Sequence, residues 1–210
     1  MTRILIADDH TIVRRGLKQI LSEESDLEVT AEASTGQQTL ERVADECFDV
    51  VVLDISMPGR SGLDTLIDLK RDHPDLPVLV LSMHPEEQYA VRALKFGASG
   101  YLTKESAADK LVEAIRTVAM GHKYITSEIA ERLTMELGHD RERPIHEVLS
   151  NREFEVMREL SSGKTVKQIA DQLCLSVKTI STYRTRVLEK LNMSTTAELT
   201  HYALKEGLVQ

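Results

Sequence analysis

Five polar side chains that could share one reaction site lie directly after, or just beyond, short apolar runs of the sequence. Asp8 and Asp9 follow the first run, Asp54 the third and Ser82 the fourth, and Lys104 stands two residues after the fifth. Three carboxylates at one place repel one another unless a cation neutralises them, and Mg²⁺ is a hard ion that prefers oxygen ligands. These residue types therefore predict a magnesium site.

A carboxylate beside such an ion can act as a nucleophile and accept a phosphoryl group as an aspartyl phosphate. Asp54 is the predicted acceptor because it stands alone, whereas Asp8 and Asp9 form a pair suited to holding the metal. Lys104 would hold a phosphate oxygen through its charge, and Ser82 would do so as a hydrogen-bond donor. The alternative for any single acid is a cap at a helix N-terminus, which does not account for all five groups together.

The elements that must position these side chains follow from the alternation of apolar runs and helix-like segments over the first 120 residues. Continuous Val, Ile and Leu runs are typical of strands covered on both faces, and this alternation predicts a five-stranded parallel α/β sheet of the flavodoxin-like type. Ligands of such sheets bind beyond the carboxyl ends of the strands. The predicted strands are Ile4–Ala7, Val29–Ala33, Val50–Leu53, Val78–Leu81 and Gly100–Leu102, and the predicted helices cover 11–21, 36–46, 61–72, 86–96 and 107–119.

Four motifs then carry a family resemblance: Asp8-Asp9, Asp54-Ile-Ser-Met57-Pro58-Gly59, Leu81-Ser82 and Gly97-Ala-Ser-Gly-Tyr101-Leu-Thr-Lys104. Together they resemble the receiver domain of bacterial two-component response regulators, over residues 1–120. The resemblance implies that Asp54 is the phosphoacceptor and that Asp9 and Asp54 ligate Mg²⁺ directly. It also implies that Asp8 acts largely through water, that the Ser56 carbonyl is a further ligand, and that Ser82 and Tyr101 rearrange on phosphorylation. Many receivers have proline after the lysine of this motif, whereas Glu105 stands here.

The back half is predicted to be helical. Thr126–Leu137 forms one helix, the polar stretch Gly138–Pro144 is a linker, and capping boxes are expected at Ser150–Glu153 and Thr195–Glu198, with Gly207 ending the last helix. A helix ending near Leu173 is followed by a second from Val177 to Leu191. An apolar stripe on that second helix comprises Val177, Ile180, Val187, Leu188 and Leu191, and its opposite face carries Lys178, Ser181, Thr182, Thr185 and Arg186.

Short polar side chains and cations on one helix face are typical of a helix that reads the major groove, although a plain helical bundle shows the same amphipathic pattern. The motifs Ser150-Asn-Arg-Glu-Phe-Glu-Val, Ile169-Ala170 and Val177-Lys-Thr-Ile-Ser resemble the LuxR-type helix-turn-helix. That resemblance places Lys178, Ser181, Thr182 and Thr185 toward bases, while Arg184 lies nearer the apolar stripe and is expected to pair with Glu153 or Glu155. The predicted domains are a receiver at 1–120, a linker with a helix at 121–144, and an all-α DNA-binding domain at 145–210, an arrangement similar to the NarL/FixJ subfamily.

Composition agrees with a cytoplasmic location. No apolar run approaches the length of a membrane span, and two cysteines, Cys47 and Cys174, are expected to be small buried hydrophobes rather than a disulfide. His10 is expected to face solvent at a helix start, and His84 to overhang the phosphate. Residues 1–140 carry 25 acidic and 15 basic side chains, and residues 141–210 carry 9 and 11. We therefore expect the acidic receiver to mask the basic recognition helix, the one predicted from Val177 to Leu191, before phosphorylation.

These features predict a DNA-binding transcriptional regulator switched by phosphorylation of Asp54, with no dedicated enzymatic turnover. The predicted partners are a sensor histidine kinase, promoter DNA and a second copy of the chain, and the role also allows contact with RNA polymerase. One alternative is a Mg²⁺-dependent phosphohydrolase, although the second aspartate expected just beyond Asp54 is missing. The other is an adaptor whose helical tail binds protein.

Overall fold

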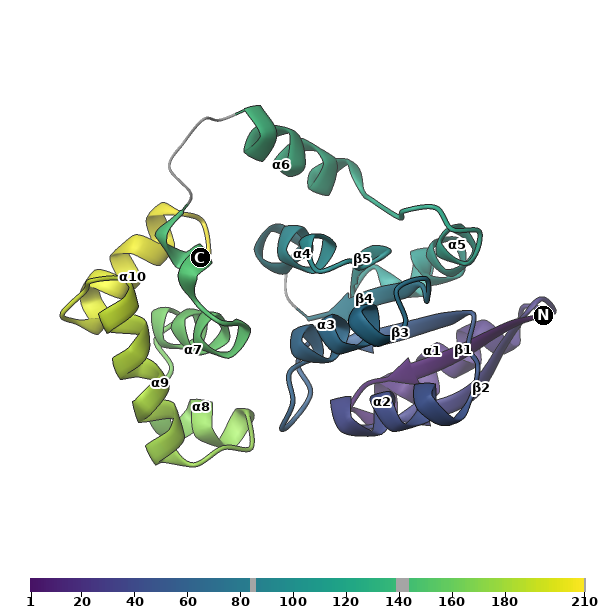
Figure 1. Cartoon of the computed structure of the whole chain (residues 1–210), viewed down its shortest axis with the longest axis horizontal. Coiled ribbons are helices and arrows are strands. Elements are labelled where there is room, and N and C mark those ends of the chain that lie inside the picture. The colour runs from purple at the N-terminus through teal and green to yellow at the C-terminus, as the bar shows by residue number, and fades with distance from the viewer. Residues whose placement is uncertain (84–85, 139–143, 210) are drawn as a thin grey trace. The chain divides into compact units, whose positions relative to one another are not determined.

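The computed structural model describes residues 1–83, 86–138 and 144–209. The chain divides into two compact units, a first unit over Met1–Glu136 and a second over Leu137–Gln210 (Figure 1). The division falls inside the region predicted as the linker, so the domain boundaries at 120 and 145 stay a prediction. Within the described ranges, no helix is long and apolar enough to cross a membrane.

The first unit is built on a five-stranded sheet with strand order β2-β1-β3-β4-β5, in which every neighbouring pair is parallel. This order is that of a flavodoxin-like sheet, as the sequence predicts. The strands are β1 (Thr2–Ala7), β2 (Leu27–Ala33), β3 (Val50–Asp54), β4 (Val78–Ser82) and β5 (Gly100–Thr103). All residues of β3 and β4 are buried, because helices cover the central strands on both faces.

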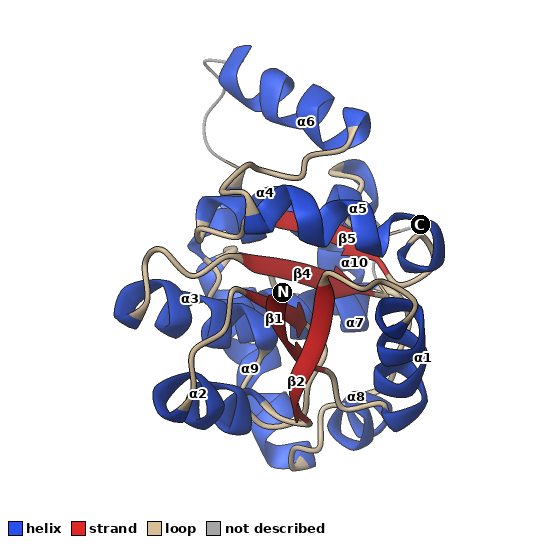
Figure 2. Cartoon of the chain, turned by 90° about the vertical axis from the view of Figure 1, so that its right-hand side faces the viewer, coloured by secondary structure: helices blue, strands red, loops and turns tan. Residues whose placement is uncertain are grey.

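Helices follow each strand, with bounds close to those predicted. They are α1 (Thr11–Ser22), α2 (Gly36–Asp45), α3 (Gly62–Asp72), α4 (Glu86–Lys95) and α5 (Ala107–Ala119), and α6 (Ser127–Gly138) comes after the sheet is complete. Helix α1 packs beside α5, and α2 packs beside α3. Figure 2 shows α1 and α5 on one side of the strands and α2 and α3 on the other.

Over residues 144–209 the second unit contains a short 3₁₀ helix and four α-helices. They are η1 (Ile145–Val148), α7 (Asn151–Ser161), α8 (Val166–Gln172), α9 (Val177–Lys190) and α10 (Thr196–Lys205). Helix α7 contacts α8, α9 and α10, and α8 contacts α9. Phe154, Ile169, Ile180, Val187 and Leu199 are fully or almost fully buried and form the core of this unit.

Side chains at the helix starts explain where the helices of this unit begin. The predicted capping box of Ser150 and Glu153 is confirmed. At the other predicted box, the Thr195 hydroxyl accepts from the Glu198 amide, but the Glu198 carboxylate accepts from the Ser194 amide, so only half of it forms. A complete box that the sequence analysis did not include opens α8, between Thr165 and Gln168.

Left-handed residues terminate several helices. Gly207 ends α10 with φ +67°, as predicted. At the end of α8 the same position is taken by Cys174, with φ +52°, whose amide donates to the Asp171 carbonyl while the next amide donates to that of Ala170. Cys174 and Cys47 are both exposed, so the prediction of two buried cysteines is wrong: both lie in connections after a helix, outside the cores.

Candidate functional site

The parallel pairing brings the predicted reaction-site residues to one edge of the sheet. Ala7, which precedes Asp8, pairs with Leu53, which precedes Asp54. Ser82 closes β4 and pairs with Thr103 of β5, and the amide of the next residue, Lys104, donates to the Ser82 carbonyl at 2.7 Å. The chain therefore places Asp8, Asp54, Ser82 and Lys104 at the carboxyl ends of neighbouring strands.

Lys104 is the cation at the centre of this edge. Its Nζ lies 2.6 Å from Asp8 Oδ2 and 2.7 Å from Asp54 Oδ2. The two carboxylates are 1% and 0% exposed, and the lysine side chain is 7% exposed. Because burial weakens hydration of the ions, the ammonium and the carboxylates depend on one another for stabilisation.

The pKa values of these groups are shifted by burial and by their neighbours. Burial raises the pKa of Asp54, and the charge of Asp8 adds to this, while Lys104 acts in the opposite direction. Burial alone would lower the pKa of Lys104, but the carboxylates of Asp54 and Asp8 outweigh it, so the lysine pKa is raised. Lys104 is therefore a firmly protonated cation beside an aspartate that resists ionisation.

A candidate metal centre lies at the end of β1. Asp8, Asp9, His10 and Asp54 each offer a ligand atom, and these atoms all lie within 4.8 Å of one another. Three of the four groups are carboxylates, the oxygen ligands that suit Mg²⁺, and receiver domains generally bind that ion. The donor set therefore fits the predicted ion.

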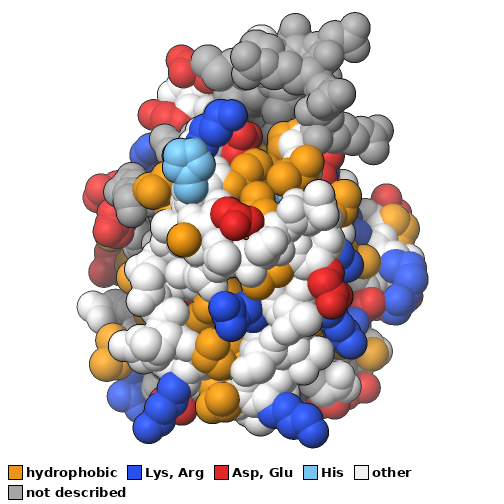
Figure 3. All heavy atoms as spheres, turned by 90° about the vertical axis from the view of Figure 1, so that its left-hand side faces the viewer, with side chains coloured by type: hydrophobic (Ala, Val, Ile, Leu, Met, Phe, Trp, Pro, Cys, Tyr) orange, Lys and Arg blue, Asp and Glu red, His pale blue; other side chains and the backbone are white. Residues whose placement is uncertain are grey.

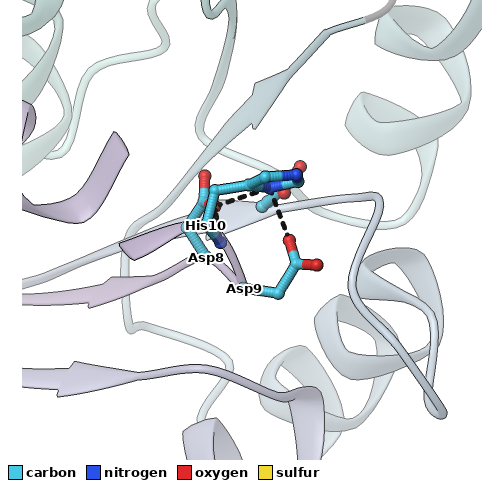
Figure 4. A group of neighbouring side chains, drawn as sticks. Asp8, Asp9 and His10 are labelled. Atoms are coloured by element: carbon cyan, nitrogen blue, oxygen red, sulfur yellow. Dashed lines mark hydrogen bonds and ion pairs between the residues drawn. The ribbon is translucent and has the colours of Figure 1, made fainter. Parts of the chain in front are cut away.

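His10 lies across the acidic pair, as Figure 4 shows. Its Nδ1 is 2.8 Å from Asp9 Oδ1 and 3.3 Å from Asp8 Oδ1, although its side chain is 60% exposed. It is also the cap residue of α1, with its amide donating to Asp8 Oδ1 at 2.7 Å. The prediction of a solvent-facing helix start is confirmed, and the imidazole in addition contacts both acids.

The other predicted residues of this site lie beside it. The Ser56 amide donates to Asp54 Oδ1 at 3.1 Å, so the loop after β3 touches the candidate acceptor. Ser82 and Tyr101 are both fully buried and lie on adjacent strands, with Tyr101 paired to Val80. His84, which the sequence analysis placed over the phosphate, lies outside the described residues.

Two residues that the sequence analysis missed shape the loops of the site. Arg14 Nη1 donates to the Asp8 carbonyl at 2.6 Å, and its Nε pairs with Glu32 of β2 at 3.0 Å. Gly62 opens α3 directly against β3, where a Cβ atom would overlap the Asp54 carbonyl oxygen. The signal for Gly62 was its place just beyond the Met57-Pro58-Gly59 turn, but the close approach appears only once the loop is folded.

The candidate nucleic-acid interface is the polar face of α9. Its members are all exposed: Lys178, Ser181, Thr182, Thr185 and Arg186. The hydroxyls of Ser181, Thr182 and Thr185 each donate to the carbonyl four residues earlier, at 2.9–3.1 Å. Their oxygens still have lone pairs available to accept a hydrogen bond from a partner.

A shallow depression lies on this face, lined by Ser176, Lys178, Thr179, Thr182, Tyr183 and Arg186. Of these six residues, Ser176, Thr179 and Tyr183 were not predicted to contact DNA. Figure 3 shows the side of the molecule that carries α9 and α10, with Lys and Arg side chains in its lower part.

Two details of the predicted recognition helix are wrong. Val177 is 51% exposed and does not join the apolar stripe, because it is the first residue of α9 and lies beyond the core. Arg184 pairs with neither Glu153 nor Glu155; its Nε donates to the Thr196 hydroxyl at 3.1 Å. The last turn of α9 meets the start of α7, so Lys190 pairs with Glu153 instead, at 2.7 Å.

Comparisons with known proteins match both parts of the chain. Residues 4–116 match the response regulator receiver domain, and residues 147–203 match the luxR family of bacterial regulatory proteins. The chain is 37% identical over 209 residues to the response regulator GacA of Pseudomonas protegens, covering 100% of this chain and 98% of GacA. It is 36% identical to the response regulator UvrY of Escherichia coli, covering 99% of this chain and 96% of UvrY.

Solved structures of RcsB are similar over almost the whole length. RcsB from Salmonella enterica serovar Typhimurium, bound to a promoter in the presence of the phosphate mimic BeF₃⁻, is 27% identical, with a TM-score of 0.60 and 98% of both chains covered. A structure of two RcsB dimers on two parallel DNAs gives the same values. Because the likeness to GacA and UvrY spans both the sheet unit and the helical unit, this chain belongs to the response regulators of the NarL/FixJ type, transcriptional regulators in which a receiver domain precedes a LuxR-type DNA-binding domain.

Proposed function

We propose that Asp54 accepts a phosphoryl group from a sensor histidine kinase and that the phosphorylated protein then binds promoter DNA as a homodimer. The observation that carries the proposal is the buried Asp54 carboxylate, held 2.7 Å from Lys104 beside Asp8. A buried acid with a raised pKa, one cation and further acids around it is an arrangement suited to chemistry on that acid.

In the proposed reaction, a carboxylate oxygen of Asp54 forms a bond to phosphorus while the bond from phosphorus to the donor nitrogen breaks. The electron pair of the broken bond stays on the donor. Mg²⁺, when bound, neutralises charge on the phosphoryl oxygens; Asp9 and Asp54 would ligate it, with Asp8 acting through water and Ser56 offering its carbonyl. Lys104 stabilises an oxygen of the new phosphate by its charge.

The same residues would convert phosphorylation into a change of shape. The phosphoryl group adds about two negative charges next to Lys104, which in the unmodified protein is shared between Asp8 and Asp54. Ser82, at the end of β4, would donate to a phosphate oxygen, and Tyr101, fully buried on β5, would rearrange with it. This rearrangement would then favour a receiver conformation whose surface pairs two chains.

For DNA, we propose that Ser181, Thr182 and Thr185 face base edges and that Lys178 and Arg186 contact phosphates, with Lys178 also near the bases. The support is their shared exposed face on α9 and the absence of acids from that face before Glu189. RcsB dimers bound to DNA support a dimeric complex. Because promoter DNA is the target, we place the protein in the cytoplasm, where RNA polymerase is a further partner.

We also propose the division into a receiver at 1–120, a linker at 121–144 and a DNA-binding domain at 145–210. The receiver is proposed to mask α9 before phosphorylation, since the front of the chain is acidic and α9 is basic. The phosphoryl group is lost slowly from Asp54, and no separate substrate is turned over. The residues two and four beyond Asp54 are Ser56 and Pro58, which leaves no second aspartate there to act as a general acid.

The test compares DNA binding by wild-type protein and by Asp54→Asn, each with and without a small phosphodonor and Mg²⁺. Promoter fragments from the native host serve as probes, and the wild type is expected to bind more tightly after phosphodonor treatment while the variant does not respond. An equal response of the variant would refute the role of Asp54. Turnover of many phosphate esters per chain would favour a phosphohydrolase, and salt-insensitive association without affinity for duplex DNA would favour an adaptor.

A further inference from the structure

The chain turns back sharply after α5 and returns to the sheet. Gly121, with φ +81°, donates its amide to the Val118 carbonyl, and the His122 amide donates to that of Thr117. These two bonds form a Schellman turn, which reverses the chain at a left-handed residue. The next residues, Lys123 and Tyr124, are thereby directed toward the start of β5.

Residues 123–124 are held against the start of β5 and the two residues before it. The Tyr124 amide donates to the Ser99 carbonyl at 2.9 Å, and Tyr124 forms an isolated parallel bridge with Gly100. Lys123 Nζ donates to the Ala98 carbonyl at 2.6 Å. The Tyr124 ring packs against the apolar core of the first unit. We call residues 123–124 the linker root. It extends the sheet at its β5 edge by a short strand-like segment.

Gly100 is required for this approach. A Cβ atom at that position would lie 2.9 Å from both the Cβ and the carbonyl oxygen of Tyr124, and 3.0 Å from a methyl carbon of Leu79. Any larger residue must therefore push the linker root away from β5 or shift the strand. The backbone of Gly100 itself is not strained, so its small size, rather than conformational freedom, is what the structure uses.

Strand β5 carries one residue of the predicted phosphorylation site and directly precedes another. Tyr101 follows Gly100 directly, and Lys104 leaves the end of the same four-residue strand. A change in position of Tyr101 or Lys104 thus acts on a strand whose other end holds the root of the linker, which continues into α6 and toward the DNA-binding unit.

We propose that Gly100 and Lys123 are positioning residues that bind the linker root to β5, so that rearrangement at phosphorylated Asp54 reaches the linker through that strand. This inference rests on the proposed function. Neither residue touches the reaction site, so their loss should leave phosphoryl uptake unchanged and reduce only its effect on DNA affinity. Removing a hydrogen bond from a charged donor changes an equilibrium constant roughly tenfold. We therefore expect a loss of that size in the effect of phosphorylation on DNA affinity.

The experiment uses full-length wild-type protein, Lys123→Ala, Lys123→Arg and Gly100→Ala, with Lys110→Ala as a matched surface-lysine control on α5. Three quantities are measured: phosphoryl uptake by intact mass, the ratio of promoter affinity with and without phosphodonor, and hydrogen exchange of the peptide that contains Tyr124. In Lys123→Ala and Gly100→Ala we expect normal uptake, faster exchange at Tyr124 and an affinity ratio reduced by roughly tenfold. Lys123→Arg should restore the ratio, and Lys110→Ala should resemble the wild type.

The outcomes separate this inference from the function on which it rests. If the wild type takes up phosphate without any change in DNA affinity, the proposed function fails, and this inference fails with it. If the wild type responds and both Lys123→Ala and Gly100→Ala respond equally well, only the inference is refuted, whether or not exchange at Tyr124 has changed. If Gly100→Ala does not fold, Lys123→Ala alone tests the inference. Lys123 is exposed, and its replacement removes one hydrogen bond, to the Ala98 carbonyl.

Discussion

Replacing Lys104 by methionine should destabilise the receiver strongly near neutral pH. Methionine retains an apolar stem of similar length but removes the ammonium that lies 2.6 Å from Asp8 and 2.7 Å from Asp54. Both carboxylates are almost completely buried, so they lose their partner without gaining water. Removing one partner of a buried ion pair costs about 3–5 kcal/mol of unfolding free energy.

The pH dependence follows from the directions of the pKa shifts. The raised pKa of Lys104 means that its contribution is fully present below the ordinary lysine pKa of 10.5 and is lost as pH rises through the folded value. The pKa of Asp54 is raised, so this acid becomes neutral at a higher pH than an ordinary aspartate. The cost of Lys104→Met should therefore be greatest near neutral pH and shrink as pH falls through the pKa of Asp54. Added Mg²⁺ should raise the unfolding free energy of the variant, since a ligand that binds the native state alone stabilises that state.

Hydrogen exchange of peptides from β1 and β3 measures this cost without requiring both units to unfold together. At 1.36 kcal/mol per factor of ten, exchange through receiver unfolding should be about 150 to 5,000 times faster in Lys104→Met near neutral pH. Lys110→Ala, on the surface of α5, serves as the control and should exchange like the wild type. An acceleration of less than about tenfold near neutral pH, or an acceleration that does not shrink as the pH is lowered, would refute the reasoning about the buried pair.

Three further predictions concern recognition, communication and the helix-turn-helix turn. Thr182→Ala should alter preference among operators, whereas Lys178→Ala should weaken all of them and flatten the salt dependence by about 0.9 per lost phosphate contact, as measured by binding titrations over a salt series. A folded fragment starting near Arg141 should bind target DNA without phosphodonor at least as tightly as the intact unmodified protein; weaker binding would show that the receiver supplies a dimer contact and does not mask α9. Cys174→Gly should raise the unfolding free energy of the second unit by up to roughly 1 kcal/mol in thermal unfolding, because relief of the left-handed strain exceeds the entropy that glycine adds to the unfolded chain.

The sequence predicted the five-stranded parallel sheet and the shared edge because apolar runs and the residues after them obey simple rules. A strand covered on both faces must be continuously apolar, so the polar residue that ends it is easily seen, as at Asp54 and Ser82. The strand ends then converge by topology alone. The apolar stripe of α9 was predicted for the same reason, through Ile180 and Val187.

The errors came from contacts that depend on three-dimensional packing. The partner of Glu153 is Lys190 and not Arg184, because the crossing of α7 and α9 decides which basic residue reaches it. Val177 has an apolar side chain at helical spacing, but the end of a helix can extend past its core. The roles of Gly62 and Gly100 depend on how close another backbone passes, which composition and periodicity do not report.

The central claim is that Asp54 is the acceptor, and the most direct measurement is the position of the phosphoryl group. Full-length protein is treated with a small phosphodonor and Mg²⁺, analysed by intact mass, and digested to locate the modified residue. The account predicts one acid-stable, base-labile phosphoryl group, found on the peptide that contains Asp54 and absent from Asp54→Asn. A group on any other residue of the wild type, or equal labelling of Asp54→Asn, would contradict it.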